Sequence, residues 1–268
     1  IRTMGQIQGS PPKSSDFVVL RKFNKPIITP DLDPSIGTNI NGPSLIRTPK
    51  WLRSAPGKYL LYFAHHNGKS IRLAYADDLK GPWKVVLEGA LQIDKSYFSD
   101  HVASPCAVID DAAKEIRLYY HGLTPSDGGQ HTRVAVSKDG VHFVAQQEPV
   151  QRNSAYWKLF KHDSYWYALA MPGKLFRSQK GLDVFEPGRQ LFPNQPTFIH
   201  CGILQDGDNI FVFYTRAGDS PESILVSKVS TKGPWTDWSV GPLQIVLSPE
   251  KDFEGADLPA KPATIGAV

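Results

Sequence analysis

One strand–turn–strand unit recurs along this chain and limits what the chain can fold into. In its first copy, two apolar segments, Tyr59–Ala64 and Ile71–Ala76, lie on either side of Asn67–Gly68. Asn-Gly is the dipeptide most typical of a two-residue hairpin turn. The copy ends in Gly81–Pro82–Trp83, and the same three residues return at Gly233–Pro234–Trp235. We therefore expect antiparallel strands in repeated sheets.

Four such units align along the sequence. Their second strands are LLYFAH, RLYYHG, YWYALA and IFVFYT. Each unit begins with one further predicted strand, and these innermost strands are Pro43–Thr48, Pro105–Ile109, Tyr156–Phe160 and Phe198–Leu204. With an outer strand added, the units repeat about every 45–60 residues, which is typical of β-propeller blades. A single blade cannot bury both of its faces, so the blades must stack around an axis.

The sequence predicts one all-β domain over residues 1–268, because almost no segment has a helical period. Four blades fall within residues 43–249, after an extended arm at residues 1–15 and edge strands within Asp16–Pro30. The tail Glu250–Val268 has the composition of a loop. A complete fifth blade would need about 40 residues more. The pattern favours a five-bladed plan with an incomplete last blade over a four-bladed ring with an irregular closure.

Charge and composition argue against several classes of partner. The net charge is +4, and the basic residues are scattered, so we expect no nucleic-acid partner; a local basic pocket for an acidic sugar stays open. No apolar run approaches the roughly 20 residues of a membrane span, and residues 1–10 do not resemble a signal peptide. We expect a soluble protein without a membrane partner. Cys106 and Cys201 lie in apolar segments and are expected to be buried free thiols.

The repeated unit resembles the five-bladed propeller glycosidases of glycoside hydrolase family 43 and its relatives. The matching segments are Gly42–Ile46, Tyr59–Phe63, Ala76–Trp83, Ser104–Val108, Ile116–Tyr120 and Lys232–Trp235. The resemblance implies a funnel at one end of the propeller axis that binds carbohydrate. It also implies an Asp before the first Pro of two innermost strands, where this chain has Gly42 and Ser104. The Glu that the family places in the third blade has no counterpart within Asn153–Lys158, so its three-carboxylate site does not carry over.

Glycoside hydrolysis ordinarily needs two carboxyl groups, and few lie at predicted funnel positions. Asp100 precedes the second innermost strand, while Asp219 and Glu222 share a short loop after the fourth unit's second strand. These three are our candidate catalytic carboxylates. For each of them, the alternative is an ordinary turn or loop residue.

Histidines recur at the predicted strand ends. His65 and His121 follow second strands and are candidate acid–base residues, while His66, His101 and His200 are candidate substrate ligands. If the blades are related by rotation, these side chains converge on the axis. Convergence would also suit a single metal ion there, although the sequence requires no cofactor. The alternative is that each histidine packs a strand end and bonds backbone.

Four further residues are candidate sugar ligands. Asn41 lies beside the first innermost strand, and Arg216 could grip a carboxylate or hydroxyl groups. Tyr156 and Trp157 are aromatic residues able to stack on a sugar face, with core packing as the alternative. Together with the resemblance, these residues predict an oligo- or polysaccharide partner of plant or microbial origin.

Three functions remain open on the sequence alone. The first is a glycoside hydrolase of polysaccharide degradation, which needs two carboxylates within about 10 Å. The second is a polysaccharide lyase on uronate-containing glycans, using His and Arg or a metal. The third is a non-catalytic propeller that binds glycans or proteins.

Overall fold

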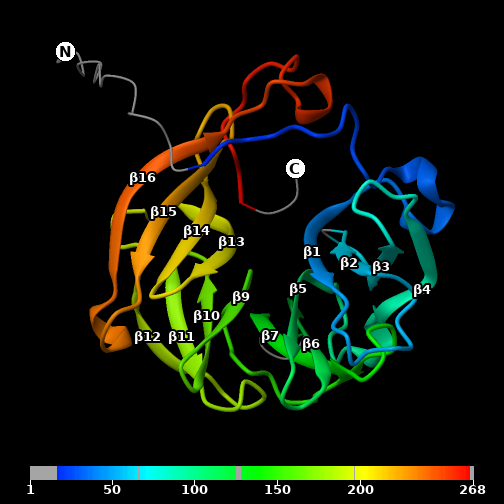
Figure 1. Cartoon of the computed structure of the whole chain (residues 1–268), viewed down its shortest axis with the longest axis horizontal. Coiled ribbons are helices and arrows are strands. Elements are labelled where there is room, and N and C mark those ends of the chain that lie inside the picture. The colour runs from blue at the N-terminus through cyan, green and yellow to red at the C-terminus, as the bar shows by residue number, and fades with distance from the viewer. Residues whose placement is uncertain (1–16, 66, 125–127, 196, 266–268) are drawn as a thin grey trace.

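The computed structural model describes residues 17–65, 67–124, 128–195 and 197–265, and within them all four predicted units fold into sheets. Each sheet has four antiparallel strands, and neighbours in sequence are neighbours in the sheet. Figure 1 shows the sheets standing as blades around a common axis. The prediction of a β-propeller is confirmed.

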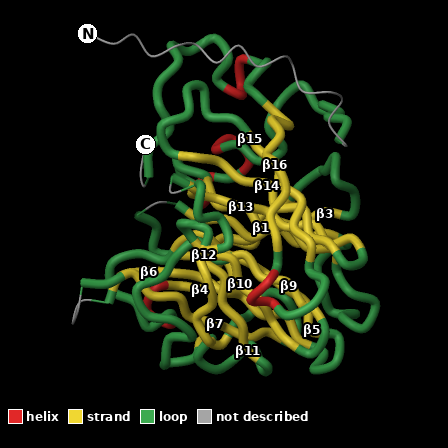
Figure 2. The backbone as a smooth tube through the Cα atoms, turned by 90° about the vertical axis from the view of Figure 1, so that its left-hand side faces the viewer, coloured by secondary structure: helices red, strands yellow, loops and turns green. Residues whose placement is uncertain are grey.

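The blades contain sixteen strands in chain order. Blades 1 and 2 comprise β1 (Asn41–Arg47), β2 (Tyr59–Ala64), β3 (Ser70–Ala76), β4 (Lys84–Gln92), β5 (Ala103–Asp110), β6 (Glu115–Leu123), β7 (Gln130–Ser137) and β8 (Val144–Ala145). Blades 3 and 4 comprise β9 (Lys158–His162), β10 (Tyr165–Ala170), β11 (Lys174–Ser178), β12 (Glu186–Gln190), β13 (Phe198–Asp206), β14 (Asn209–Arg216), β15 (Ile224–Ser230) and β16 (Ser239–Leu247). The described helices are five 3-10 turns of three residues each, which lie between strands or outside the sheets (Figure 2).

The second strands are buried on both faces, which explains their nearly continuous apolar sequence. In β2, Leu60 and Tyr62 belong to the core shared with blade 2, where they meet Ile116. The alternate residues Leu61 and Phe63 face the other side of the sheet. Successive side chains of a strand point to opposite faces, so each blade contributes to two cores. The same alternation in β6 and β10 builds the cores between blades 2 and 3 and between blades 3 and 4.

A recurring tyrosine hydroxyl joins one blade to the next. The Tyr62 hydroxyl in blade 1 donates to the carbonyl oxygen of Gly140 in blade 2, at 2.7 Å. The equivalent Tyr119 in blade 2 donates to the carbonyl oxygen of Gly181 in blade 3, also at 2.7 Å. Burial raises the pKa of both tyrosines well above the ordinary value, so the hydroxyls stay protonated and can donate.

The blade count corrects the sequence analysis, because the described residues form four blades instead of five. Between blade 4 and blade 1, Figure 1 shows an N-terminal and a C-terminal segment where a fifth sheet was expected. The edge strands predicted within Asp16–Pro30 are wrong, since residues 17–40, all described, contain only two 3-10 turns. Pro26, Pro30 and Pro34 explain this, because proline cannot donate to a strand ladder.

The N-terminal segment, residues 17–40, links blade 4 to blade 1. Phe17 packs edge-on against the rings of Phe211 and Phe213 in β14, with centroids 5.1 and 5.0 Å away. At the other end, the buried Arg72 of β3 donates to the backbone carbonyls of Ile36 and Asn39. Irregular chain thus covers the outer face of blade 1 and completes the ring.

Two smaller observations concern the thiols and the membrane. Cys106 and Cys201 are buried and free, as predicted. Within the described residues, no helix is both long and apolar enough to cross a membrane.

Candidate functional site on the propeller axis

The innermost strands bring four equivalent positions to the axis. Gly42, Ser104, Tyr156 and His200 each lie at or beside the start of one innermost strand, β1, β5, β9 and β13. The ladders of β1, β5 and β13 are irregular at this point, which turns the first residues inward. A Cβ atom added to Gly42 would lie only 3.1 Å from the Cα atom of Ser104, so the blades meet closely here.

A cavity of about 420 Å³, here named the axial cavity, opens at this meeting point. It is lined by Asn41, Gly42, Pro43, Ser104, Tyr156, Trp157, Lys158, His200, Cys201, Glu222 and Thr264. The buried lining residues, Trp157 and Cys201, form its closed end, and the exposed His200, Glu222 and Thr264 form its mouth. Its volume lies within the range of small-molecule sites.

A row of four rings runs beside the axial cavity. The ring centroids of His101 and His121 lie 6.0 Å apart, those of His121 and Tyr156 4.7 Å, and those of Tyr156 and His200 5.0 Å. Tyr156 and His200 line the cavity, while His101 and His121 are buried behind them. The predicted convergence of strand-end histidines is therefore observed for three of the five.

His121 is held neutral in this row. Burial is the main cause that lowers its pKa to about 3, and His101 and His200 add to the effect. Its Nδ1 accepts a hydrogen bond from the backbone N–H of Tyr156, at 3.4 Å, which places the ring proton on Nε2. His121 therefore positions Tyr156 and is a poor proton donor near neutral pH.

Asp100 and His101 form a pair of their own. The Asp100 carboxylate lies 2.7 Å from His101 Nδ1, and this hydrogen bond lowers the pKa of Asp100 below its ordinary value. The Asp100 side chain is 58% exposed and does not line the axial cavity. In this arrangement Asp100 orients His101 and does not face the cavity.

The loop after β14 presents Glu222. Arg216 holds Asp219 with two hydrogen bonds of 2.9 Å each, so both side chains are already engaged. Backbone bonds of 2.9 Å join Gly218 and Asp219 to Ala263 of the C-terminal segment. Within the described part of the chain, the Glu222 carboxylate has no hydrogen-bond partner and is the only carboxylate lining the axial cavity.

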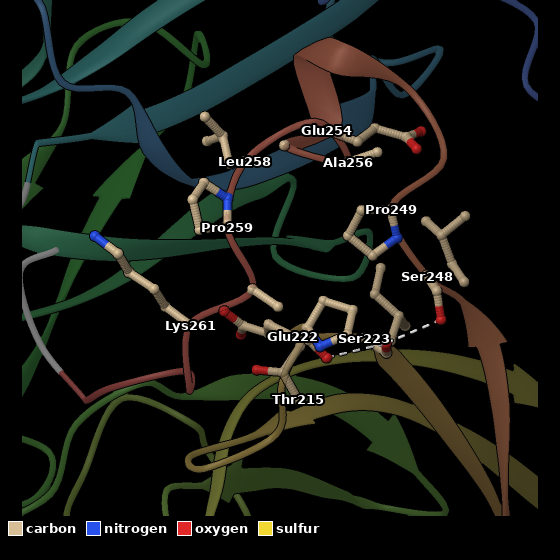
Figure 3. A pocket seen from close by; sticks show the side chains of 15 residues that line it. Thr215, Glu222, Ser223, Ser248, Pro249, Glu254, Ala256, Leu258, Pro259 and Lys261 are labelled. Atoms are coloured by element: carbon tan, nitrogen blue, oxygen red, sulfur yellow. Dashed lines mark hydrogen bonds between the residues drawn. The ribbon is translucent and has the colours of Figure 1, made fainter.

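A second cavity of about 740 Å³, here named the closure cavity, lies between the blade 4 edge and the C-terminal segment. Figure 3 shows Glu222 and Ser223 on one side and Leu258 and Pro259 of the C-terminal segment on the other. Glu222 lines both cavities. The two cavities therefore meet at this side chain.

Several candidates fall outside the axial cavity or play another part. The ring of Trp157 stacks on Phe176 at 5.1 Å and its Nε1 donates to Ser154, so the predicted sugar-stacking role is wrong and the ring packs the core. His65 Nδ1 accepts the backbone N–H of Asn67, and the Ala64–Ser70 connection is longer than the predicted two-residue turn. His66 lies outside the described residues.

An axial metal ion stays a prediction without support from side-chain geometry. Among the described residues, no three His, Cys, Asp or Glu side chains are grouped so that they could hold a metal ion. The rings of His101 and His121 meet edge to face, and Tyr156 separates His121 from His200.

Six lining residues were not candidate ligands in the sequence analysis, and Lys158 and Thr264 are two of these. Lys158 lies two residues after Tyr156, and the period of two in a strand could have placed both on one face. Thr264 reaches the axis because the C-terminal segment folds back across the loop after β14. No local sequence pattern predicts this long-range contact of the C-terminal segment.

The fold is that of the family 43 glycoside hydrolases. A β-xylosidase/α-arabinofuranosidase of this family from a compost microbial metagenome, solved with xylotriose, superposes with a TM-score of 0.63, covering 82% of this chain and 79% of its own. A family 43 enzyme from Xanthomonas citri with xylotriose gives 0.60, covering 81% and 76%. Both are 13% identical to this chain, so the likeness shows the fold alone.

No model of a known protein family matches the sequence. The chain is 35% identical over 261 residues to an uncharacterized protein of Acanthamoeba polyphaga mimivirus, covering 85% of this chain and 73% of that protein. The chain belongs to the same family as this mimivirus protein.

Proposed function

We propose that this protein binds an oligosaccharide through the axial cavity. The observation that carries the proposal is the composition of the cavity: the Tyr156 ring, the Asn41 amide and His200 surround a space of about 420 Å³ on the propeller axis. An aromatic face with a few convergent polar groups suits a sugar ring. The structures from the compost metagenome and Xanthomonas citri are complexes with xylotriose, which supports a saccharide as ligand.

The ligand is proposed to extend beyond one sugar unit. The axial and closure cavities share Glu222, so a chain that enters one can continue into the other. Exposed apolar residues of the C-terminal segment, such as Leu258, give the closure cavity surface against which a sugar face can pack. A trisaccharide is then expected to bind more tightly than its monosaccharide.

The test is calorimetry with xylose- and galactose-based oligosaccharides on the wild type and on Tyr156→Ala. We expect at least about a tenfold loss of affinity, equal to about 1.4 kcal/mol, because the ring against the sugar is removed. Tyr97→Ala is the matched control, since Tyr97 also has a positive φ (61° against 58°) but lines neither cavity. Equal losses in both variants, or no saccharide binding at all, would overturn the proposal.

Hydrolysis at the same site is a second candidate, favoured by the Glu222 carboxylate, which has no hydrogen-bond partner among the residues that the structure describes. The ordinary pair of carboxylates is missing from the described lining, but some glycosidases use a tyrosine nucleophile, and Tyr156 lines the same cavity. Glu222 would then serve as the proton-transferring carboxyl group. Reducing sugar that appears with the wild type and is abolished in both Glu222→Gln and Tyr156→Phe would support hydrolysis.

The lyase alternative makes a different product. It would release an unsaturated uronate that absorbs in the ultraviolet, whereas hydrolysis releases reducing ends alone. Intact oligosaccharide after prolonged incubation, with binding retained, would leave the protein as a carbohydrate-binding propeller.

A further inference from the structure

We infer that the saccharide held in the axial cavity carries an anionic group and that Lys158 is the cation that binds it. This inference rests on the proposed function, because it names the class of ligand for the same cavity. Two observations support it: Lys158 lines the cavity, and its ammonium group has hydrogen-bonding capacity left over.

Lys158 is the first residue of β9, half-buried, and lines the axial cavity. Its Nζ donates to the carbonyl oxygen of Pro105 at 3.2 Å. An ammonium group has three donors, so capacity for two further bonds remains. Within the described residues, no carboxylate comes within 4.0 Å of this nitrogen to form an ion pair, although Glu222 lines the same cavity.

The charge lies toward the closed end of the cavity. Lys158 Nζ bonds the carbonyl oxygen of Pro105, the residue before the buried Cys106, and the buried Cys201 lines the same cavity. Glu222, in contrast, is exposed at the mouth. Lys158 is half-buried and has no anionic partner among the described residues, so its charge attracts an incoming anion.

The neighbouring groups fix how such a ligand would lie. Tyr156 and Lys158 both face the cavity, so a sugar ring against the tyrosine places a substituent against the ammonium. Glu222 at the mouth repels an anionic group and accepts hydrogen bonds from sugar hydroxyls. The anionic group therefore enters first, and the neutral remainder of the saccharide lies toward the closure cavity.

The anion can be the carboxylate of a uronic acid or a sulfate ester. Lysine is a compact point charge without the planar fork of arginine, so it does not select between a planar carboxylate and a tetrahedral sulfate. Both groups carry a negative charge that an ammonium group binds, and the experiment separates them.

The test compares three ligands of the same length: a galacturonic acid disaccharide, a sulfated galactose disaccharide and the neutral galactose disaccharide. We expect the wild type to bind at least one anionic disaccharide about tenfold or more tightly than the neutral one at low salt. Lys158→Met should abolish this preference while keeping the affinity for the neutral sugar, and Lys158→Arg should retain it. The preference should shrink as salt increases.

Lys161→Met is the matched control, because Lys161 lies on the same strand but is exposed and lines neither cavity. It should bind all three ligands as the wild type does. Equal affinity of the wild type for anionic and neutral disaccharides would overturn this inference while leaving the proposed function intact, and so would a preference that survives in Lys158→Met. If none of the saccharides binds, both fail together.

Discussion

At the scale of residues, four axial positions determine which chemistry the fold can perform. The propeller brings Gly42, Ser104, Tyr156 and His200 to the lining of one cavity, and not one of these four residues carries a carboxylate. Glu222 reaches the same cavity from a loop. A site with one carboxylate, one phenol and one ammonium binds a polar ligand readily but lacks the usual pair for hydrolysis.

Also at the scale of residues, His121 makes the free energy of unfolding depend on pH. The pKa of His121 in the folded protein is about 3, below the ordinary value near 6.5. Between these two pH values the imidazole is protonated in the unfolded chain but stays neutral in the folded protein. Stability from this group is therefore complete above pH 6.5 and falls as the pH falls toward 3. Between pH 7.5 and 5.0 we expect a loss of about 2 kcal/mol in the free energy of unfolding.

Urea unfolding at several pH values measures this dependence. His121→Asn, which retains an acceptor near the backbone N–H of Tyr156, should be less stable at pH 7.5 but should lose less between pH 7.5 and 5.0. Parallel pH profiles for the wild type and the variant would refute the assignment of a buried neutral imidazole.

At the scale of elements, each blade is an antiparallel meander whose second strand supplies two cores. The bond from Tyr62 to Gly140, and its counterpart from Tyr119 to Gly181, fix the rotation between adjacent blades. Both acceptors are carbonyls of glycine turns that are buried at the contact. Such a carbonyl has no access to water if the hydroxyl is removed.

Tyr119→Phe tests the contribution of these bonds. The substitution keeps the ring and leaves the Gly181 carbonyl without its donor, so we expect the free energy of unfolding to fall by about 1–2 kcal/mol. Tyr75→Phe is the control, because the Tyr75 side chain is only partly buried and the described residues provide its hydroxyl with no hydrogen bond. A change below about 0.5 kcal/mol in Tyr119→Phe would mean that the bond does not lock the blades.

At the scale of the whole molecule, the ring is completed by two irregular segments tied to each other. Arg21 donates to Glu254 at 2.9 Å and to the carbonyl oxygen of Ser248 at 2.8 Å, and it pairs with Glu250 at 2.9 Å. The C-terminal segment then passes the loop after β14 and brings Thr264 to the axial cavity. Closure of the ring and completion of the site therefore depend on the same C-terminal segment.

Weakening this closure should expose the terminal segments before the blades unfold. The hydrogen bond from Arg21 is the main cause that lowers the pKa of Glu254 to about 2 from about 4.5, so the ion pair is intact above pH 4.5 and is lost as the pH falls toward 2. Arg21→Gln should therefore lower the protection of the amides of residues 250–265 at neutral pH, measured as the exchange rate relative to the intrinsic rate at the same pH. It should also remove the further loss of protection that we expect of the wild type as the pH falls toward 2.

The control for this prediction is Arg177→Gln, which breaks an ion pair within blade 3, where Arg177 meets Glu186 at 2.8 Å. It should leave exchange in the terminal segments unchanged. Unaltered exchange in Arg21→Gln would show that other contacts, such as Phe17 against Phe211, hold the closure.

The local sequence pattern was sufficient to predict the strands but not the connections at their ends. The nearly continuous apolar runs of LLYFAH and its three counterparts predicted the second strands, because a strand buried on both faces is apolar along its length. They could not predict the Ala64–Ser70 connection, where a histidine side chain accepts the Asn67 N–H. The side chain of Trp157 was equally ambiguous, since a ring for a sugar and a ring for the core have the same sequence signature.

The sequence by itself determined the four repeated units, the propeller and the absence of carboxylates from two family positions, because each depends on residue type and short-range spacing. Only the tertiary structure decided that the ring has four blades among its described residues, closed by Arg21 and the C-terminal segment. It alone placed Lys158, Tyr156 and Glu222 in one cavity. Tyr156 and Lys158 come from blade 3 and Glu222 from a loop of blade 4, so their meeting depends on how the sheets stack around the axis, which no local pattern encodes.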